Sequence, residues 1–377
     1  MTLGTGVLRV TYLSVDPVGS TVGSSQVLAY VLRLAERGVK VDLHSFEHDE
    51  EPQILELLST AGVNWIPHRF GANGAIGGLG RVVRLAWHVR GAAIVHARSD
   101  MAAAATMASS VDRWIWDVRS FWADQKVATG VFSADSVQAR VFRWVEKISA
   151  RRSTQVITLT ASAVAELDHR YGDVVGPKST VITTCVDRTR FIQSSPPTEG
   201  PLRVLLAGTL NRYYDVPGMI KLIEVLRQRS EVEFIVASPG RTDWEVELLA
   251  VGAVRISATA EEMPALINSC HVGLSVCRED AGASLLAAMP TKIGEFLAVG
   301  RPVVVNQGLV DATHMIERAQ AGIGLSPDMD FGLVADRIFS LVADPATVER
   351  AADLAAENFD LDRGIDELIR IYDELSR

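Results

Sequence analysis

The amino-acid sequence predicts an α/β protein with two doubly wound, Rossmann-like parallel sheets. Short apolar strands alternate with amphipathic helices along most of the 377 residues, a rhythm typical of parallel sheets covered by helices on both faces. The length suffices for two ordinary domains, and an apolar fraction of 48% allows each domain to bury a core. Residues 194–201, which read Ser-Ser-Pro-Pro-Thr-Glu-Gly-Pro, have no periodicity and predict a linker. A single barrel of this length is the competing interpretation.

The first half begins with a strand and a helix whose apolar residues share one stripe, and Gly38 ends that helix. Apolar runs predict strands at Val7–Leu13, Val39–Ser45, Val63–Pro67, Ala93–Ala97, Trp114–Val118, Thr154–Leu159 and Ser179–Thr183. Helical periodicity predicts helices at Ser24–Arg37, Glu51–Ala61, Leu79–Arg90, Asp100–Ser110, Asp135–Arg152 and Ser162–Tyr171. The segment Phe121–Phe132 is the longest without a pattern, so we interpret it as a candidate functional loop.

The second half repeats the same rhythm. Strands are predicted at Leu202–Ala207, Val232–Ala237, Ala253–Ile256, His271–Val276, Pro302–Asn306 and Ile323–Leu325. The predicted helices include Asp215–Gln228, Ala260–Asn268, Thr291–Val299, Gly332–Ala343, Pro345–Glu357 and Asp362–Leu375. We expect the two sheets to turn the carboxyl ends of their strands toward a central cleft, the usual ligand position in such folds.

Composition indicates a soluble, cytoplasmic protein. No apolar run reaches the roughly 18 residues of a membrane span, and the first run, Val7–Leu13, is too short for a signal sequence. The three cysteines, Cys185, Cys270 and Cys277, are scattered and fit buried, reduced thiols better than a disulfide framework.

The net charge of −9 is unevenly distributed. Residues 1–195 hold 21 Lys and Arg against 18 Asp and Glu, a net charge of +3, so the remainder carries −12. Only the first half therefore favours an anionic surface, and we expect no nucleic-acid partner. The sequence gives no indication of an oligomeric state.

One predicted helix in the first half, Asp135–Arg152, is both basic and amphipathic. It sets Arg140, Arg143, Lys147, Arg151 and Arg152 opposite Val137, Val141, Trp144, Val145 and Ile148. Such a helix either contacts an anionic membrane surface or packs its apolar stripe on its own sheet, and the second interpretation is the more common case.

The stretch Pro290–Val305 predicts a ligand site. A helix begins there just after the strand His271–Val276, and the first amides of such a helix favour an anion. Lys292 stands in the first turn, where the helix dipole does not favour a cation, so we interpret it as a phosphate ligand. Glu295, one turn further, is a candidate for binding a hydroxyl group.

A glycine-bearing loop between the first strand and the first helix is a second candidate. Gly19 and Ser20 could cradle a phosphate, although the glycine spacing is not that of a dinucleotide-binding motif. A flexible turn between strand and helix is the alternative interpretation.

Several segments carry a resemblance to a known family. Residues 94–99 read Ile-Val-His-Ala-Arg-Ser, residues 156–160 Val-Ile-Thr-Leu-Thr, and residues 181–187 Val-Ile-Thr-Thr-Cys-Val-Asp with a later Phe191. The stretch Pro290–Val305 is similar to Phe-Gly-x-x-x-Glu-Ala-x-Ala-x-Gly-x-Pro-Val-Val and is the most specific match. Over most of its length, the chain thus resembles the GT-B glycosyltransferases, in particular family 4 of the retaining enzymes that use sugar nucleotides.

The resemblance implies roles for the second half. It implies that Glu295 holds the ribose hydroxyls of the nucleotide, and that the amides of Thr291 and Lys292 hold the diphosphate. Gly208 and Thr209 match the family's Gly-Arg-Leu after the first strand of this domain, so they are further candidates for the diphosphate.

Three charged residues of the family are absent from their usual places. Thr209 replaces an Arg, Pro217-Gly218 replaces Lys-Gly, and Ala287 replaces a Glu that meets the donor sugar. Arg212 is our candidate to supply the lost charge, because a guanidinium suits a diphosphate. A surface Arg on a loop is the alternative.

Asp117 and Arg119 are the candidate catalytic residues, since Arg119 stands where the family's active-site His is expected. An Arg cannot be a general base, but a front-face retaining transfer leaves that work to the leaving phosphate. Arg119 would then stabilise charge or orient the acceptor, and Asp117 would orient Arg119 or approach the sugar. The alternative is an Asp–Arg pair that closes a loop.

Neighbouring residues add secondary candidates for the acceptor site. Phe121 and Trp122 could stack on a sugar face. His96 could line the acceptor pocket together with Arg98, although we interpret it first as a strand-end His that bonds only the backbone.

We therefore predict a retaining glycosyltransferase of the hexosyltransferase type. It would move a sugar from a nucleoside-diphosphate sugar to a saccharide, lipid-linked or small-metabolite acceptor, without a metal or other cofactor. Residues 1–193 would bind the acceptor and 202–358 the donor, and residues 359–377 would cross back to the first domain. The alternatives are a GT-B sugar-nucleotide epimerase and a non-catalytic sugar-nucleotide-binding partner subunit.

Overall fold

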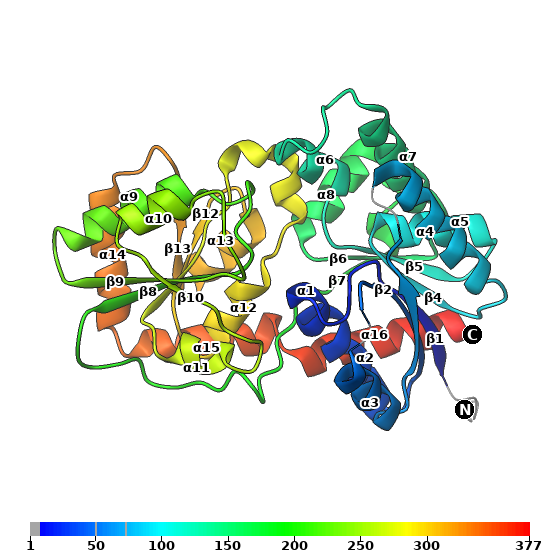
Figure 1. Ribbon diagram of the computed structural model, residues 1–377, viewed down its shortest axis with the longest axis horizontal. Helices are drawn as coiled ribbons and strands as arrows, with labels where there is room; N and C mark the ends of the chain where they lie inside the picture. Colours follow the sequence, from blue (N-terminus) through cyan, green and yellow to red (C-terminus); the bar gives the residue numbers. More distant parts are fainter. Residues whose placement is uncertain (1–7, 50, 72–73) are drawn as a thin grey trace. The chain divides into compact units, whose positions relative to one another are not determined.

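The computed structural model describes residues 8–49, 51–71 and 74–377, and the chain divides into two compact units. The first unit comprises the residues up to Ala123, Phe132–Ile182 and Leu361–Arg377. The second comprises Asp124–Val131 and Thr183–Asp360 (Figure 1).

The first unit is built on a parallel sheet of seven strands in the order β3-β2-β1-β4-β5-β6-β7. The strands are β1 (Arg9–Leu13), β2 (Lys40–Glu47), β3 (Asn64–Arg69), β4 (Val95–Arg98), β5 (Trp114–Val118), β6 (Gln155–Thr158) and β7 (Ser179–Val181). Chain order reverses between β1 and β4, which pair with Tyr12 opposite His96. Such a reversal opens a crevice at the carboxyl ends of the two strands.

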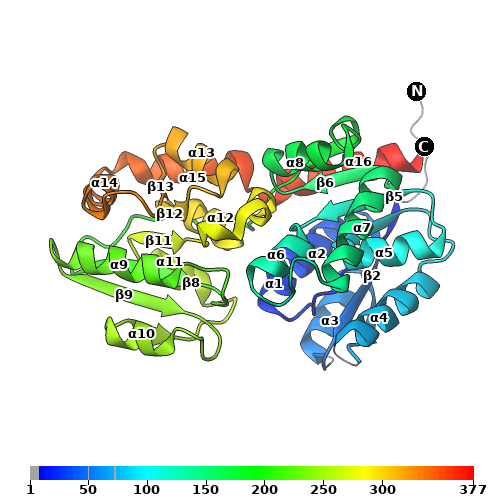
Figure 2. The ribbon, with the colours of Figure 1, turned by 90° about the horizontal axis from the view of Figure 1, so that it is seen from above.

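Helices cover both faces of this sheet. On one face α4 (Gly74–His88), α5 (Asp100–Ser109), α7 (Val137–Arg152) and α8 (Ala161–Tyr171) follow one another in a row, each in contact with the next (Figures 1 and 2). The other face carries α2 (Ala29–Glu36), α3 (Pro52–Thr60) and α16 (Leu361–Ser376). A short α1 (Thr21–Gly23) and one π-helical turn (Ser24–Leu28) lead into α2.

The C-terminal helix α16 packs on the first unit. Its buried residues recur every three or four positions, at Leu361, Gly364, Ile365, Leu368, Ile371, Tyr372 and Leu375. Arg33 of α2 lies 2.6 Å from Asp362, and Arg37 pairs with both Asp362 and Asp366. The apolar stripe buries the helix, and the ion pairs fix its register against α2.

The second unit holds a parallel sheet of six strands in the order β10-β9-β8-β11-β12-β13. The strands are β8 (Leu202–Ala207), β9 (Val232–Ala237), β10 (Val254–Ile256), β11 (Val272–Ser275), β12 (Val303–Asn306) and β13 (Gly322–Leu325). Their nearly continuous burial is expected for parallel strands covered on both faces. Here the order reverses between β8 and β11.

One hydrophobic core joins the strands to α9 (Val216–Arg227) and α14 (Phe331–Ala343), through residues such as Val204, Phe234, Leu222 and Ile338. α10 (Glu245–Ala250) adds Leu248 to this core. α12 (Thr291–Ala298) contacts β11, α11 (Met263–Asn268) and α15 (Ala346–Asn358), and α15 also contacts α13 (Val310–Arg318). The two doubly wound parallel sheets confirm the predicted fold class.

Some predicted elements need correction or completion. The segment Phe121–Phe132 is not all loop, because α6 spans Trp122–Ala128. The helices α10 and α13 and the 3-10 segment Glu279–Ala287 have no counterpart among the predicted elements. Val7, the predicted start of the first strand, lies outside the described residues.

The three cysteines are free and buried, as predicted. None of the helices in the described part of the chain combines the length and apolarity that crossing a membrane requires.

Candidate functional site

The first turn of α12 joins two predicted ligand residues directly. Lys292 Nζ lies 2.5 Å from Glu295 Oε2, one turn along the helix. Glu295 is only 3% exposed, and the Lys292 side chain is 14% exposed. Thr291, the first residue of the helix, is half-buried, and the N-cap Pro290 offers no side-chain cap. A buried carboxylate therefore sits beside a cation at a helix start that no side chain caps.

Close packing fixes α12 in this place. A Cβ on Gly294 would lie 2.8 Å from the Phe359 ring and 2.9 Å from Val186. A Cβ on Gly273 of β11 would lie 2.3 Å from Phe296. Only glycine allows these approaches, so the two positions let α12 pack directly against β11 and against Phe359 and Val186.

The loop after β8 meets the segment after β11 at the point where the strand order reverses. Gly208 has a φ of +131°, which a residue with a side chain rarely adopts, and its N–H donates to Ala237 O at 2.9 Å. Tyr214 forms an antiparallel bridge with Cys277, and the Tyr213 hydroxyl lies 3.0 Å from Ser284 Oγ. The loop containing Gly208 is thus tied to the segment that leads into α12.

The remaining candidates of this unit lie in different surroundings. Thr209 is exposed beside Gly208. The Arg212 side chain pairs with Asp243 at 3.3 Å, and both side chains are 67% exposed, so this pair is weak. Ala287, which stands where the family has a Glu, is completely buried.

In the first unit, Asp117 and Arg119 form a buried pair at the carboxyl end of β5. Arg119 Nη1 lies 3.3 Å from Asp117 Oδ1, and Arg119 Nη2 donates to Gln26 Oε1 at 3.0 Å. The Asp117 and Arg119 side chains are 3% and 11% exposed. Gln26, from the π-helical turn before α2, was not predicted, because nothing local to it signals a partner nearly a hundred residues away.

The charges of this pair stabilise each other. Burial alone would raise the pKa of Asp117, but the Arg119 charge and the His96 hydrogen bond outweigh it and bring the pKa to about 2. Burial would lower the pKa of Arg119, yet the Asp117 carboxylate raises it above its ordinary value. Asp117 is therefore ionised at neutral pH, and Arg119 cannot act as a proton donor.

His96 differs from its first interpretation. Its Nε2 lies 3.1 Å from Asp117 Oδ2, and its Nδ1 lies 2.7 Å from the Tyr372 hydroxyl. Because Asp117 is ionised, Nε2–H donates to it, and in the neutral imidazole Nδ1 accepts from Tyr372. His96 thus bonds side chains rather than only the backbone, and it holds Asp117 from the side opposite Arg119.

Arg98 and Asp16 face each other across the β1–β4 reversal. Arg98 is 4% exposed, and its Nη1 lies 2.5 Å from Asp16 Oδ2. Among the described residues, no acceptor meets its buried Nε. Asp16 is a further polar residue at this edge that sequence reasoning did not single out.

The buried Glu47 of β2 holds the glycine-bearing loop of the first unit in place. The buried Glu47 carboxylate accepts from Val18 N at 3.0 Å, and a Cβ on Gly19 would lie 2.2 Å from Glu51 Oε1. Ser20 is the N-cap of α1, where its Oγ accepts from Gly23 N at 3.0 Å and donates to Pro17 O at 2.7 Å. In this conformation the Ser20 hydroxyl serves the helix start.

The two aromatic candidates also have other roles. Phe121 is fully buried, with the Arg170 guanidinium 4.4 Å from its ring centre, so it cannot stack on a sugar. Trp122 packs against Phe132 and Phe142, with ring centres 5.5 and 4.1 Å away.

Comparison with known proteins places this geometry in a known fold. No protein-family model and no curated protein matches the sequence. Sucrose-phosphate synthase from Thermosynechococcus elongatus is similar in structure, with a TM-score of 0.71, 16% identity, and coverage of 97% of this chain and 98% of that one. HepE from Anabaena, solved with UDP and glucose, has a TM-score of 0.69 and 15% identity, and the match covers 96% of this chain and 98% of HepE. A glycosyltransferase from Rickettsia africae has a TM-score of 0.66 and 12% identity, with coverage of 97% of this chain and 98% of that one.

The chain has the GT-B fold. At these identities the likeness establishes the architecture alone, so the chemistry has to be argued from the residues themselves.

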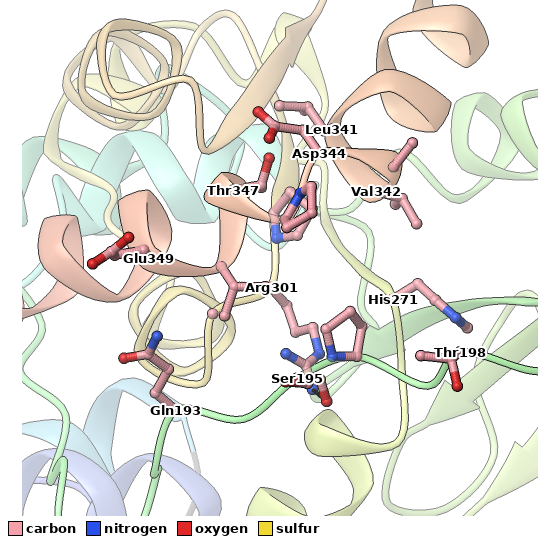
Figure 3. A pocket seen from close by; sticks show the side chains of 16 residues that line it. Gln193, Ser195, Thr198, His271, Arg301, Leu341, Val342, Asp344, Thr347 and Glu349 are labelled. Carbon is pink, nitrogen blue, oxygen red and sulfur yellow. Dashed lines mark hydrogen bonds between the residues drawn. The ribbon is translucent and has the colours of Figure 1, made fainter.

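A separate cavity opens in the second unit, at the amino ends of β11 and β12. It has a volume of about 440 Å³ and is lined by residues of the segments 193–198 and 341–349 and by residues that precede β11 and β12, among them His271 and Arg301 (Figure 3). Arg301 is fully buried, and all its hydrogen bonds go to backbone carbonyls or the Ser194 hydroxyl. Because those bonds occupy its N–H groups, Arg301 anchors the 194–195 segment and is not available to a ligand.

Residues 328–330 read Asp-Met-Asp, and Asp330 has a structural role. Its side chain caps α14, where it accepts from Gly332 N at 2.7 Å. Within the described residues, no group of three or more His, Cys, Asp or Glu is arranged to hold a metal ion.

Proposed function

We propose that this chain is a glycosyltransferase that moves a sugar from a nucleoside-diphosphate sugar to an acceptor. The observation that carries the proposal is the buried Glu295 beside Lys292 at the start of α12, at the carboxyl edge of a GT-B sheet. A buried carboxylate that can accept two vicinal hydroxyl groups suits a ribose, and a helix N-terminus with a cation suits a diphosphate. The likeness to Anabaena HepE, solved in complex with UDP-glucose, supports the donor class.

In this proposal the second unit binds the donor. Glu295 accepts from the ribose hydroxyls, the amides of Thr291 and Lys292 bind the diphosphate, and the Lys292 ammonium neutralises part of its charge. Gly208 and Thr209 border the same edge, and Gly208 lets the backbone come close to a phosphate because it has no side chain. Arg212 would have to leave the exposed Asp243 to take part, at little cost.

The first unit would bind the acceptor and supply Asp117 and Arg119. Asp117, ionised and held by His96, can fix Arg119 and stabilise positive charge that develops on the sugar. Arg119 can stabilise the negative charge of the departing diphosphate. Neither residue offers a general base near pH 7, so we propose that the leaving phosphate accepts the acceptor proton, with retention and without a metal.

The first test is ligand binding by the purified chain. Nucleoside diphosphates at about 100 times Kd should stabilise the fold by about 2.7 kcal/mol, seen as a rise in Tm. Donor hydrolysis and transfer onto a panel of acceptors would be measured next. EDTA would test whether the reaction requires a metal, and NMR of the product would give its anomeric configuration. No stabilisation by any nucleoside diphosphate would contradict the proposal.

Ala287 supports a second candidate function. Ala287, a fully buried methyl group, replaces the family's sugar-contacting Glu, so this contact to the donor sugar is lost. A sugar-nucleotide-binding subunit that partners an active enzyme would tolerate that loss. Stabilisation by a nucleoside diphosphate without turnover on any acceptor would favour this candidate.

A further inference from the structure

The outer face of α4 is unusually apolar. Ile76, Leu79, Val83 and Trp87 are 85%, 66%, 61% and 67% exposed. Their spacing of three or four residues sets them on one narrow stripe of the helix. Leu85, Ala86 and Val89 already fill the buried side, so the outer stripe contributes nothing to the core.

The outer face of α7 repeats this pattern. Val137, Val141 and Trp144 are 63%, 49% and 58% exposed and share one stripe. The sequence-based expectation that the apolar stripe packs on the sheet therefore holds only for Val145, which is buried, and for the half-buried Ile148, while the other three residues are exposed. Both helices pack on their own sheet with one face and expose a second apolar face that carries a Trp.

The two stripes belong to one surface. α4 and α7 both contact α5, which lies between them in the row of helices on one face of the first sheet (Figures 1 and 2). Of the seven tryptophans, only Trp87 and Trp144 are exposed, and both lie here. We call the exposed residues of the two stripes the α4–α7 surface: Ile76, Leu79, Val83, Trp87, Val137, Val141 and Trp144.

The surroundings of this surface are basic. Arg81 and Arg84 lie in α4 and Arg90 follows it, and residues 57–99 contain no acidic residue. On α7 the exposed Arg140, Lys147 and Arg151 follow the apolar stripe along one side. The acidic residue within α7, Glu146, is buried and bonds Arg170 and Tyr171.

We propose that the α4–α7 surface docks on an anionic lipid bilayer. An exposed apolar stripe bordered by cations is the pattern of a helix that lies in the membrane interface. Each stripe would enter the acyl boundary while the basic side chains reach the headgroups. The Arg90 guanidinium, 4.7 Å from the centre of the Trp87 ring, already shows this pairing of an amphipathic ring with a cation.

Charge favours lipid over the other occupants of an apolar surface. A second copy of the chain would bring two basic faces together, which costs energy by like-charge repulsion. A nucleic acid would use the cations but would leave the apolar stripes without a partner. An anionic bilayer satisfies both features, and it requires no nucleotide, so this proposal stands apart from the proposed function.

The test uses the full chain and lipid vesicles. Flotation with phosphatidylcholine vesicles is compared with vesicles that contain phosphatidylglycerol, at low and high salt. We expect binding to the anionic vesicles, weakened by salt because a shorter Debye length screens the basic residues. Brominated lipid should quench the fluorescence of the exposed Trp87 and Trp144.

Two sets of variants separate the apolar and basic contributions. Leu79→Ser with Trp144→Ser should weaken binding at least tenfold, because it removes an apolar side chain from each stripe. Arg140→Gln with Lys147→Gln should weaken it roughly thirtyfold, since each basic residue at an anionic surface contributes a factor of about five. Val246→Ser with Leu249→Ser, at the 77% and 58% exposed positions of α10, is the matched control and should bind like the unaltered chain.

Three outcomes would overturn the proposal. They are no binding to anionic vesicles at low salt, equal binding by all variants, and a concentration-dependent dimer that only the α4–α7 variants dissolve. The last outcome would assign the surface to a second copy. Because every substituted side chain is exposed, an unchanged Tm should accompany each result and exclude misfolding.

Discussion

Lys292 Nζ lies 2.5 Å from Glu295 Oε2 within the first turn of α12, so the residue predicted to bind ribose and the residue predicted to bind phosphate bind each other. A donor that uses both must insert between them or share them. Glu295→Ala should therefore raise the donor KM at least tenfold, because each hydroxyl bond to a charged acceptor contributes about 1.5–3 kcal/mol. Steady-state kinetics checks this, with the exposed Glu261→Ala as control. An unchanged KM would remove Glu295 from the site.

Lys292→Met separates the phosphate role from the structural role. If Lys292 binds the diphosphate, the variant should lose affinity for a nucleoside diphosphate more than for the matching monophosphate, whereas Glu295→Ala should weaken both equally. The variant also leaves a buried carboxylate without its cation, so Tm should fall. Calorimetric titration of both ligands measures the difference. Equal losses for the two nucleotides would assign Lys292 only to the ion pair.

Asp117→Asn keeps the shape of the side chain but removes the charge that Arg119 faces. We expect kcat to fall by about a hundredfold with little change in donor KM, because the pair acts on charge that develops in the transition state. Arg119→Lys retains a cation without the guanidinium fork, so its kcat should lie between those of the unaltered chain and Asp117→Asn. A rise in KM with unchanged kcat would instead place the pair in ground-state binding.

The buried histidines of β2 and β3 predict acid sensitivity. His44 Nδ1 lies 3.0 Å from His68 Nε2, and burial, together with the neighbouring histidines, lowers both pKa values from 6.5 to about 4. The unfolded chain thus binds protons below pH 6.5 that the folded chain does not bind until about pH 4. Stability should therefore fall by about 2 kcal/mol for each histidine, or about 4 kcal/mol for the pair, between pH 7 and 5. Urea unfolding at both pH values measures this, and His44→Gln with His68→Gln should reduce the difference.

Local sequence signals predicted the sheets well because parallel strands buried on both faces read as continuous apolar runs. The strand Trp114–Val118 agrees with the structure residue by residue. α6 was not predicted because the segment Phe121–Phe132 has too little apolar periodicity to indicate a helix. α7 shows the opposite failure: the periodicity was correct, but which apolar residues face the sheet depends on how the helix rotates against α5, which no local signal fixes.

The same limit applies to the candidate sites. The pairing of Lys292 with Glu295 follows from a spacing of three residues on one helix and was open to sequence reasoning. Gln26 and Tyr372 reach the Asp117–Arg119–His96 cluster from elements 93 and more than 250 residues away, so only the fold reveals them. Whether Arg212 meets a phosphate or Asp243 depends on loop geometry, which composition does not encode.

Arg301 offers a test of how the second unit holds the 194–195 segment. Its guanidinium donates to the carbonyls of Ser194, Ser195 and four other acceptors at 2.6–3.1 Å, and burial lowers its pKa to about 10, so it stays charged at neutral pH. Arg301→Met would leave buried carbonyls without donors and should lower the free energy of unfolding by about 3 kcal/mol or more. Arg301→Lys keeps the charge but not the planar fork and should recover only part of the lost stability.

Arg212→Met, at a 67% exposed position, is the control and should change stability by less than about 0.5 kcal/mol. Chemical denaturation of the three variants measures these differences, and equal stability of Arg301→Met and Arg212→Met would show that the segment is held by other contacts.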